Sequence, residues 1–155
     1  KNAEQSWRSK SGDFLEIFVK ESVDDKLEDI KISLEKEIPK EIKEKLELDF
    51  SGKKKLPDLD LVVHKESEPI AIISCKTTTR ERVSQTLFWK LALEKKNVDI
   101  NFYLVTTDSD EELAPGRKWR PIIEEVMDNT FLVKEEFENS EGMKPYPELL
   151  DELRK

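Results

Sequence analysis

Two apolar segments joined by a polar turn constrain the fold of this chain more than any other feature. Leu59, Leu61 and Val63 form an alternating segment, whereas residues 70–73 are continuously apolar. Residues 65–69 between them are polar and contain a proline, as turns commonly do. A continuous apolar strand is typical of a sheet that is covered on both faces. The pattern therefore predicts a β-hairpin within an α/β domain.

The remaining segments predict helices and strands in alternation around this hairpin. Helices are expected at 11–23, 81–95, 119–126 and 147–154, strands at 101–107 and 130–133, and loops at 108–116 and 138–147. Residues 25–49 leave two interpretations open, because their apolar positions fit both a helix and short strands. We expect one domain that spans residues 1–155.

Composition limits the class of protein. A single cysteine excludes an internal disulfide and a zinc site built from several cysteines. No apolar run is long enough to span a membrane, and the chain does not open on a signal peptide, so we expect a cytoplasmic protein. The net charge of −8 disfavours a nucleic-acid partner. However, basic residues gather at 53–55, 76–82 and 117–120, which would allow a basic cleft with an acidic back.

Four polar residues are expected at the open end of the hairpin. If the turn centres on Ser67, antiparallel pairing places Asp58 opposite Lys76 and Asp60 opposite Ser74. All four side chains then project from one face, where they are costly unless they bind something. An isolated Asp–Lys pair at a strand edge is more often a surface ion pair. The preceding Pro57 and the shared face favour a functional site.

The chemistry of these residues predicts metal-dependent phosphodiester hydrolysis. Mg²⁺ prefers carboxylate, carbonyl and water oxygens, and it commonly takes only one or two protein carboxylates. Asp58 is the expected principal ligand, and the carbonyl of Cys75 is a second one. Lys76 would orient or deprotonate the attacking water and offset charge on the phosphate, with Ser74 as the third catalytic residue.

Pro57-Asp58 followed by Ser74-Cys75-Lys76 resembles the signature of the PD-(D/E)xK nuclease superfamily, with serine in place of the second acid. The serine variant resembles type II restriction endonucleases that cut CCGG- and CCNGG-like sites, the EcoRII-like and related enzymes. The resemblance covers roughly residues 7 to 107. It implies a restriction-endonuclease-like core, a central mixed β-sheet flanked by helices on both faces, and a further metal-binding acid on the first helix, here Glu16.

One position departs from that group. An acid is expected 13 or 14 residues after the lysine, where this chain has Trp89 and Lys90. Either Glu94, one helical turn further on, replaces it, or the metal site consists of Glu16, Asp58 and Asp60. Both alternatives remain open at this point.

Arg80-Glu81-Arg82 follows the hairpin at the expected start of a helix. Arginine pairs with the O6 and N7 atoms of guanine, and glutamate accepts a hydrogen bond from cytosine N4. Such a triplet is by itself usually a solvated helix face. The resemblance implies that these three residues read C:G pairs. Gln85, one turn later, would contact DNA or cap the surface.

The leading hypothesis is a Mg²⁺-dependent type II restriction endonuclease that cuts double-stranded DNA at a site containing CC/GG. Symmetric sites imply a homodimer, assembled through residues 130–155 or the first helices. Two alternatives remain: a repair or structure-specific nuclease of the same fold, and a DNA-binding module that has lost catalysis.

Overall fold

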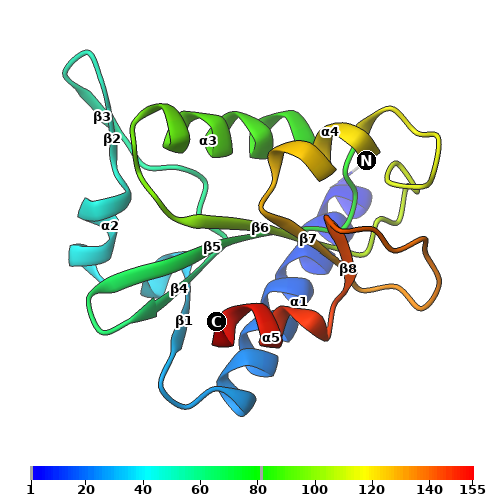
Figure 1. The fold of residues 1–155 in the computed structure, drawn as a ribbon, viewed down its shortest axis with the longest axis horizontal. Helices are drawn as coiled ribbons and strands as arrows, with labels where there is room; N and C mark the ends of the chain where they lie inside the picture. The colour runs from blue at the N-terminus through cyan, green and yellow to red at the C-terminus, as the bar shows by residue number, and fades with distance from the viewer. Residues whose placement is uncertain (1, 81) are drawn as a thin grey trace.

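The computed structural model describes the backbone of residues 2–80 and 82–155, and the side chains of this part of the chain from residue 13 onwards. Its centre is a six-stranded mixed sheet (Figure 1). The strands, in their order across the sheet, are β1 (Lys31–Leu34), β4 (Leu61–Lys65), β5 (Glu68–Lys76), β6 (Asn101–Thr106), β7 (Asn129–Leu132) and β8 (Met143–Pro145). The pairs β1–β4 and β4–β5 are antiparallel, and the pairs from β5 to β8 are parallel.

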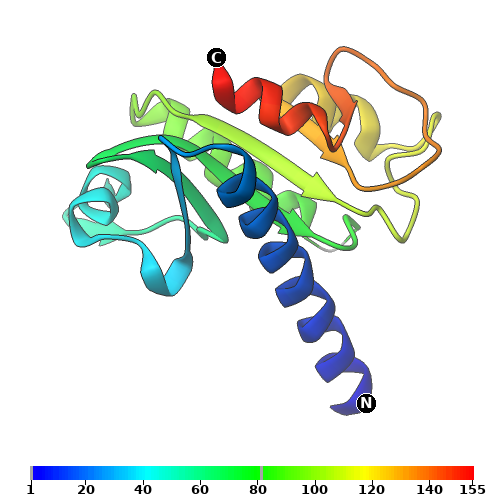
Figure 2. The same cartoon turned by 90° about the horizontal axis from the view of Figure 1, so that it is seen from below.

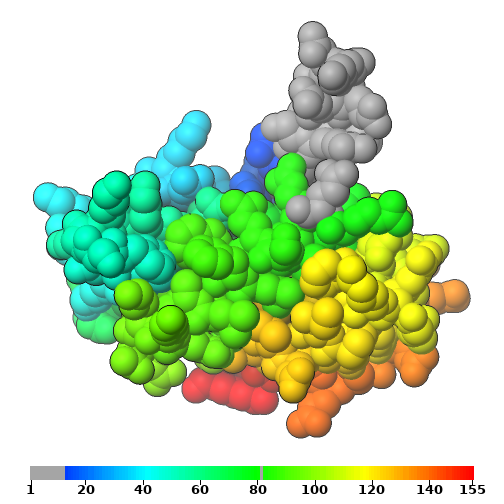
Figure 3. Space-filling model, turned by 90° about the horizontal axis from the view of Figure 1, so that it is seen from above, coloured from blue at the N-terminus to red at the C-terminus, as the bar shows by residue number. Residues whose placement is uncertain are grey.

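Helices cover both faces of this sheet. The helical elements are α1 (Asn2–Lys26), the 3-10 turn η1 (Glu35–Glu37), α2 (Lys40–Leu46), α3 (Val83–Lys95), α4 (Trp119–Val126) and α5 (Glu148–Arg154). Helices α1 and α5 lie on one face (Figure 2), and α2, α3 and α4 pack on the other. Figure 3 looks onto the second layer, where α3 lies between the α2 region and α4. The predicted α/β architecture with a mixed sheet is confirmed.

Alternation along the central strands produces two apolar cores. Leu61, Val63 and Ile73 pack toward α1 and α5, whereas Val62 and Ile72 pack toward α2, α3 and α4. All five side chains are fully buried. Successive residues of a strand point to opposite faces, so a continuous apolar segment is the pattern that a doubly covered sheet requires.

The hairpin has the predicted register near its open end. Leu61 pairs with Ile73 and Val62 with Ile72, as pairing about Ser67 requires. The register then shifts at His64, which pairs with Pro69. Proline has no N–H to donate, and a bulge at this position accommodates it. The tight turn places Glu66 in the left-handed backbone region, with φ 55°.

Several element boundaries differ from the sequence-based prediction. Residues 25–49 contain both types of structure: β1, then α2, then β2 (Leu48–Phe50), which pairs with β3 (Lys53–Lys55) in a separate hairpin. Helix α1 extends well beyond 11–23. Strand β8 lies within residues 138–147, for which the sequence predicts a loop. A three-residue strand at a sheet edge has too few residues to show a periodic pattern in the sequence. No helix in the described part of the chain has the length and apolar character needed to cross a lipid bilayer.

Candidate active site

Lys76, the last residue of β5, forms an ion pair at the open end of the hairpin. Its Nζ atom lies 3.1 Å from Oδ2 of Asp60, and the two side chains are 15% and 18% exposed. The same carboxylate oxygen accepts the backbone N–H of Cys75 at 2.8 Å. The hydroxyl of Ser74 lies 3.5 Å from it. Three consecutive residues of β5 therefore contact one carboxylate.

The partner of Lys76 differs from the one that the hairpin pattern predicts. Asp58 was expected opposite Lys76, but β4 begins only at Leu61, so ladder pairing does not extend to Asp58. Pro57 cannot donate to a ladder, which favours an irregular backbone here. Asp60, expected opposite Ser74, reaches both Ser74 and Lys76 from the bend before the strand.

Asp58 lies on the α3 side of the same region. The side-chain amide of Gln85 donates to its Oδ2 atom at 2.6 Å. Asp58, Ser74, Lys76 and Gln85 line one small hollow together with Thr86, Trp89 and Phe102. The expectation that Asp58, Ser74 and Lys76 gather on one side of the sheet thus agrees with the structure. Gln85, expected to contact DNA, bonds to Asp58 here.

Glu16 reaches this site from α1. Burial, the negative charges of Asp60 and Asp13, and a hydrogen bond with Asp60 raise the pKa of Glu16 from 4.5 to about 7. The positive charge of Lys76 opposes this rise. Close carboxyl groups avoid carrying two negative charges unless a cation compensates them. A proton on Glu16 or a cation bound between Glu16 and Asp60 would relieve this repulsion.

The residues present fit a hard divalent cation held by few protein ligands. Among the side chains that the structure describes, no group of three or more His, Cys, Asp and Glu residues is gathered as a metal cage. Mg²⁺ does not need one, because one or two carboxylates and water molecules suffice. The Cys75 thiol is not a ligand candidate: it is buried in the α1-side core, and burial raises its pKa well above the usual value.

Lys90, which occupies the position of the expected downstream acid, has a structural role. Its side chain is buried in α3, with Nζ 2.7 Å from Glu94 and 3.1 Å from Asp128. Burial opposes its charge, but hydrogen bonds with both acids raise the pKa of Lys90. Glu94 is therefore paired with Lys90 and lies outside the hollow lined by Lys76. The other alternative consists of Glu16, Asp58 and Asp60; the structure brings Glu16 and Asp60 together beside Lys76 and places Asp58 in the hollow.

The predicted reading triplet lies between β5 and α3. The backbone N–H of Arg80 donates to Asp110 at 2.9 Å, and its guanidinium donates to Glu112 through Nε at 3.0 Å and Nη2 at 2.6 Å. Arg82 is exposed and occupies the residue position just before α3, without a side-chain hydrogen bond to the helix end. Glu81 lies outside the described residues.

This fold and site have counterparts among known proteins. Residues 38–154 match the family model described as BsaWI restriction endonuclease type 2. The chain belongs to this family of type II restriction endonucleases. A protein of Methanocaldococcus jannaschii with the provisional name type II restriction enzyme MjaVIP is 30% identical over 173 residues, covering 97% of this chain and 76% of the relative.

The restriction endonuclease has a structural neighbour as well. The BsaWI enzyme, solved in a pre-specific complex with DNA, superimposes with a TM-score of 0.66 at 17% identity. The match covers 97% of this chain but only 62% of the BsaWI chain. At this identity the likeness shows the fold alone.

The acids of the 108–116 loop were not recognised in the sequence as part of the site. Asp108, Asp110 and Glu112 follow β6, whose end lies beside the end of β5 because the two strands are parallel and Lys76 pairs with Thr106. The signal in the sequence that could have indicated this role is the series of acids directly after the apolar segment 101–107.

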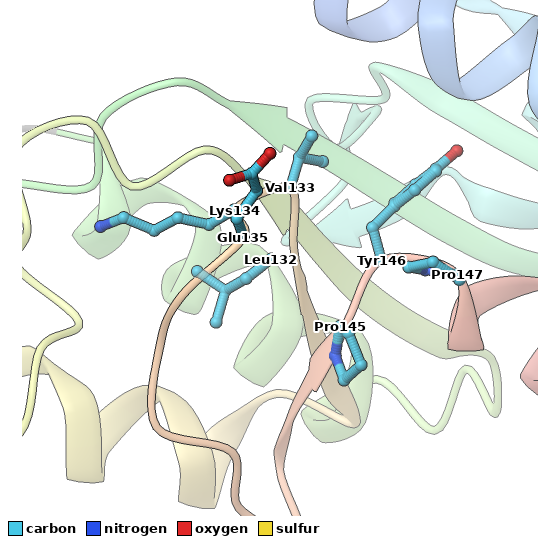
Figure 4. Close-up of a pocket in the computed structure, with 7 residues that line it drawn as sticks. All are labelled: Leu132, Val133, Lys134, Glu135, Pro145, Tyr146 and Pro147. Atoms are coloured by element: carbon cyan, nitrogen blue, oxygen red, sulfur yellow. The ribbon is translucent and has the colours of Figure 1, made fainter.

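A second hollow lies between the ends of β7 and β8 (Figure 4), and one of its lining residues, Lys134, contacts Asp108. Its lining combines apolar side chains such as Leu132 and Pro145 with Lys134, Glu135 and Tyr146. None of the predicted site residues contributes to it. The residues suited to catalysis therefore cluster at the hairpin.

Proposed function

We propose that this protein is a Mg²⁺-dependent endonuclease that hydrolyses phosphodiester bonds of double-stranded DNA at a specific site containing CC/GG. The observation that carries the proposal is the contact of Asp60 with Ser74, Cys75 and Lys76, at the end of the hairpin. Membership of the restriction endonuclease family supports it. These contacts hold the Asp60 carboxylate in place directly beside the ammonium group of Lys76.

In the proposed site, Asp60 and Glu16 would hold Mg²⁺ together with the Cys75 carbonyl, and Asp58 is a further candidate ligand. When bound, Mg²⁺ polarises the scissile phosphate and lowers the pKa of water. Ser74 and the Cys75 N–H fix the orientation of the Asp60 carboxylate. Lys76 then orients or deprotonates the attacking water and offsets negative charge at the phosphate.

Asp60→Asn and Asp58→Asn variants distinguish the contributions of the two aspartates to cleavage. We expect Asp60→Asn to reduce cleavage by a factor of about 100 or more, because it removes the charge beside both Lys76 and Glu16. Asp58→Asn keeps an acceptor for the Gln85 amide, and its loss should be smaller. Measurement of single-turnover rates with Mg²⁺ tests this order; a larger loss in Asp58→Asn would return the principal ligand to Asp58.

Arg80, Glu81 and Arg82 are proposed to read the C:G pairs. Arg80 and Arg82 are exposed at the segment that follows the catalytic strand, which supports contact with base edges when a phosphate lies at Lys76. Gln85 remains proposed as a DNA contact, and its bond to Asp58 would then also link the DNA surface to the site.

We also propose a homodimer that acts in the cytoplasm. The side chains of Phe14, Ile17 and Phe18 on α1 are 70%, 44% and 45% exposed. The ring of Phe18 lies 5.1 Å from Tyr146, which lines the hollow of Figure 4, so this apolar surface is continuous with the 130–155 region. A symmetric DNA site calls for two copies, and each would bury this surface against the other.

Sedimentation velocity of an Ile17→Asp variant tests the dimer. The expected result is a monomer, because a charge would be buried in the interface. Phe88→Asp is the matched control, since Phe88 is 53% exposed on α3, which packs on the other face of the sheet. If the Ile17 variant remains dimeric at micromolar concentration, α1 is not the interface.

The function itself is tested by digestion of plasmid DNA with Mg²⁺, followed by sequencing of the fragment ends. Discrete ends that share one short motif are expected, and a Lys76→Ala variant should give none while retaining DNA binding. Smeared products or cuts at branched junctions would instead indicate a nuclease with a repair or structure-specific task. Binding without cleavage under any divalent cation would indicate a DNA-binding module that has lost catalysis. This alternative is specific to the chain because Lys90 stands where an acid is expected.

A further inference from the structure

We propose that Asp110 and Glu112 are positioning residues that set the sequence specificity of this enzyme by holding Arg80 and its backbone in place. This inference rests on the proposed function, since it takes the 80–82 segment as the part that reads DNA. It concerns the acidic loop, residues 107–113, which connects β6 toward α4 and falls largely within the expected loop 108–116.

Asp110 binds the backbone of the reading segment. Its two carboxylate oxygens accept the N–H of Thr79 at 3.2 Å each, and Oδ2 also accepts the N–H of Arg80 at 2.9 Å. Burial opposes ionisation, but these backbone hydrogen bonds outweigh it and lower the pKa of Asp110. Successive N–H groups aimed at one anion form a nest that fixes the local backbone.

Thr79 links this contact to the start of α3. Its side chain is buried, and its hydroxyl donates to Asp108 and Asp110 at 3.3 Å each. Its carbonyl accepts the N–H groups of Arg82 and Val83, the residues at which α3 begins. The loop therefore fixes the position from which both arginines of the triplet extend.

Glu112 fixes the side chain of Arg80. One of its oxygens accepts two guanidinium hydrogen bonds, and the Glu112 side chain is 10% exposed while that of Arg80 remains 67% exposed. A largely buried acid thus binds the guanidinium of a side chain that is mostly exposed. An arginine oriented in advance loses less side-chain entropy when it binds a base, so it discriminates better between bases.

The acidic loop also connects the segment that reads DNA to the catalytic Lys76. The carbonyl of Thr77, one residue after Lys76, accepts hydrogen bonds from the N–H of Ser109 and the hydroxyl of Thr107, at 2.9 and 3.0 Å. The parallel neighbours β5 and β6 end at the same edge, so one loop contacts the chain directly after Lys76 and again at Arg80. A displaced loop would move the reading segment relative to the site of cleavage.

The test begins with the cleavage motif of the wild-type enzyme, obtained by sequencing fragment ends after digestion of plasmid DNA. Values of kcat/KM are then measured on a duplex with this motif and on duplexes with each single-base change. Asp110→Ala and Glu112→Gln should lower discrimination at the base pair read by Arg80 by about tenfold, the equivalent of one good base contact. Glu111→Gln, which removes the same charge from the exposed neighbouring residue, should cut like the wild type.

Each outcome decides between the proposals. Unchanged discrimination in both variants, with wild-type cleavage at one motif, overturns the positioning role and leaves the proposed function intact. An equal loss of rate on every duplex also overturns it, because that result indicates a purely structural role. If the wild type makes no discrete cuts, the proposed function fails and this inference fails with it. Circular dichroism confirms folding; if Asp110→Ala is unfolded, Glu112→Gln alone decides.

Discussion

Replacing Glu16 with glutamine should stabilise the folded protein at pH 8 while it removes cleavage. The pKa of Glu16 in the fold is about 7, above its ordinary value of 4.5. Between these values the folded state binds a proton that the unfolded state releases. Stability therefore decreases as the pH rises through this window and remains low above it. Glutamine cannot ionise, so the variant avoids this loss.

The size of the effect follows from the same two values. Each pKa unit corresponds to about 1.4 kcal/mol, so the rise from 4.5 to about 7 sets an upper limit of roughly 3 kcal/mol at alkaline pH. Glu16 is partly exposed, and solvent screening reduces this to on the order of 1–2 kcal/mol. For a chain of 155 residues that free energy corresponds to a rise in Tm of a few degrees at pH 8, and much less at pH 5.

Thermal unfolding followed by circular dichroism, at pH 5 and pH 8 without divalent cations, measures this difference. Glu21→Gln is the control, because it removes the same charge from an exposed position of α1. Mg²⁺ should raise the Tm of the wild type at pH 8 and leave that of Glu16→Gln unchanged, since the proposed site loses a ligand. A Tm gain that is equal at both pH values, or one that Glu21→Gln reproduces, would refute the assigned environment of Glu16.

Three further predictions concern other residues. Lys90→Met should reduce the free energy of unfolding by about 1–3 kcal/mol, because the Asp128 carboxylate loses its positively charged partner and retains the N–H of Phe102. Lys95→Met at an exposed position should have little effect, and urea denaturation measures both. Cys75 should resist alkylation by iodoacetamide in the native protein and react only after unfolding, since its thiol is buried; mass spectrometry detects the adduct, and rapid native labelling would contradict the burial. Arg82→Ala should weaken binding to the cleavage motif by about tenfold more than binding to unrelated DNA, in fluorescence anisotropy at fixed salt; an equal loss on both would indicate a phosphate contact.

The sequence by itself determined the hairpin, its register from Leu61 to Val63 and the doubly covered sheet. These features depend on which face of the strand each residue occupies, and this alternates from one residue to the next, as for Leu61, Val62 and Val63. It also indicated the family through the spacing of Asp58 and Lys76, because that chemistry is local to one hairpin. His64, the single histidine of the chain, is buried, and its Nε2 atom lies 2.9 Å from the Ser33 hydroxyl.

Only the tertiary structure decided which carboxylates meet Lys76. Strand β4 begins after the Asp58–Asp60 bend, so Asp60 takes the position beside Lys76, and Glu16 arrives from a helix more than forty residues earlier in the sequence. The contacts of Arg80 with Asp110 and Glu112 likewise span about thirty residues, and they exist because two parallel strands end at one edge. Periodicity determines which face a residue occupies, whereas contacts between distant segments depend on how elements pack together.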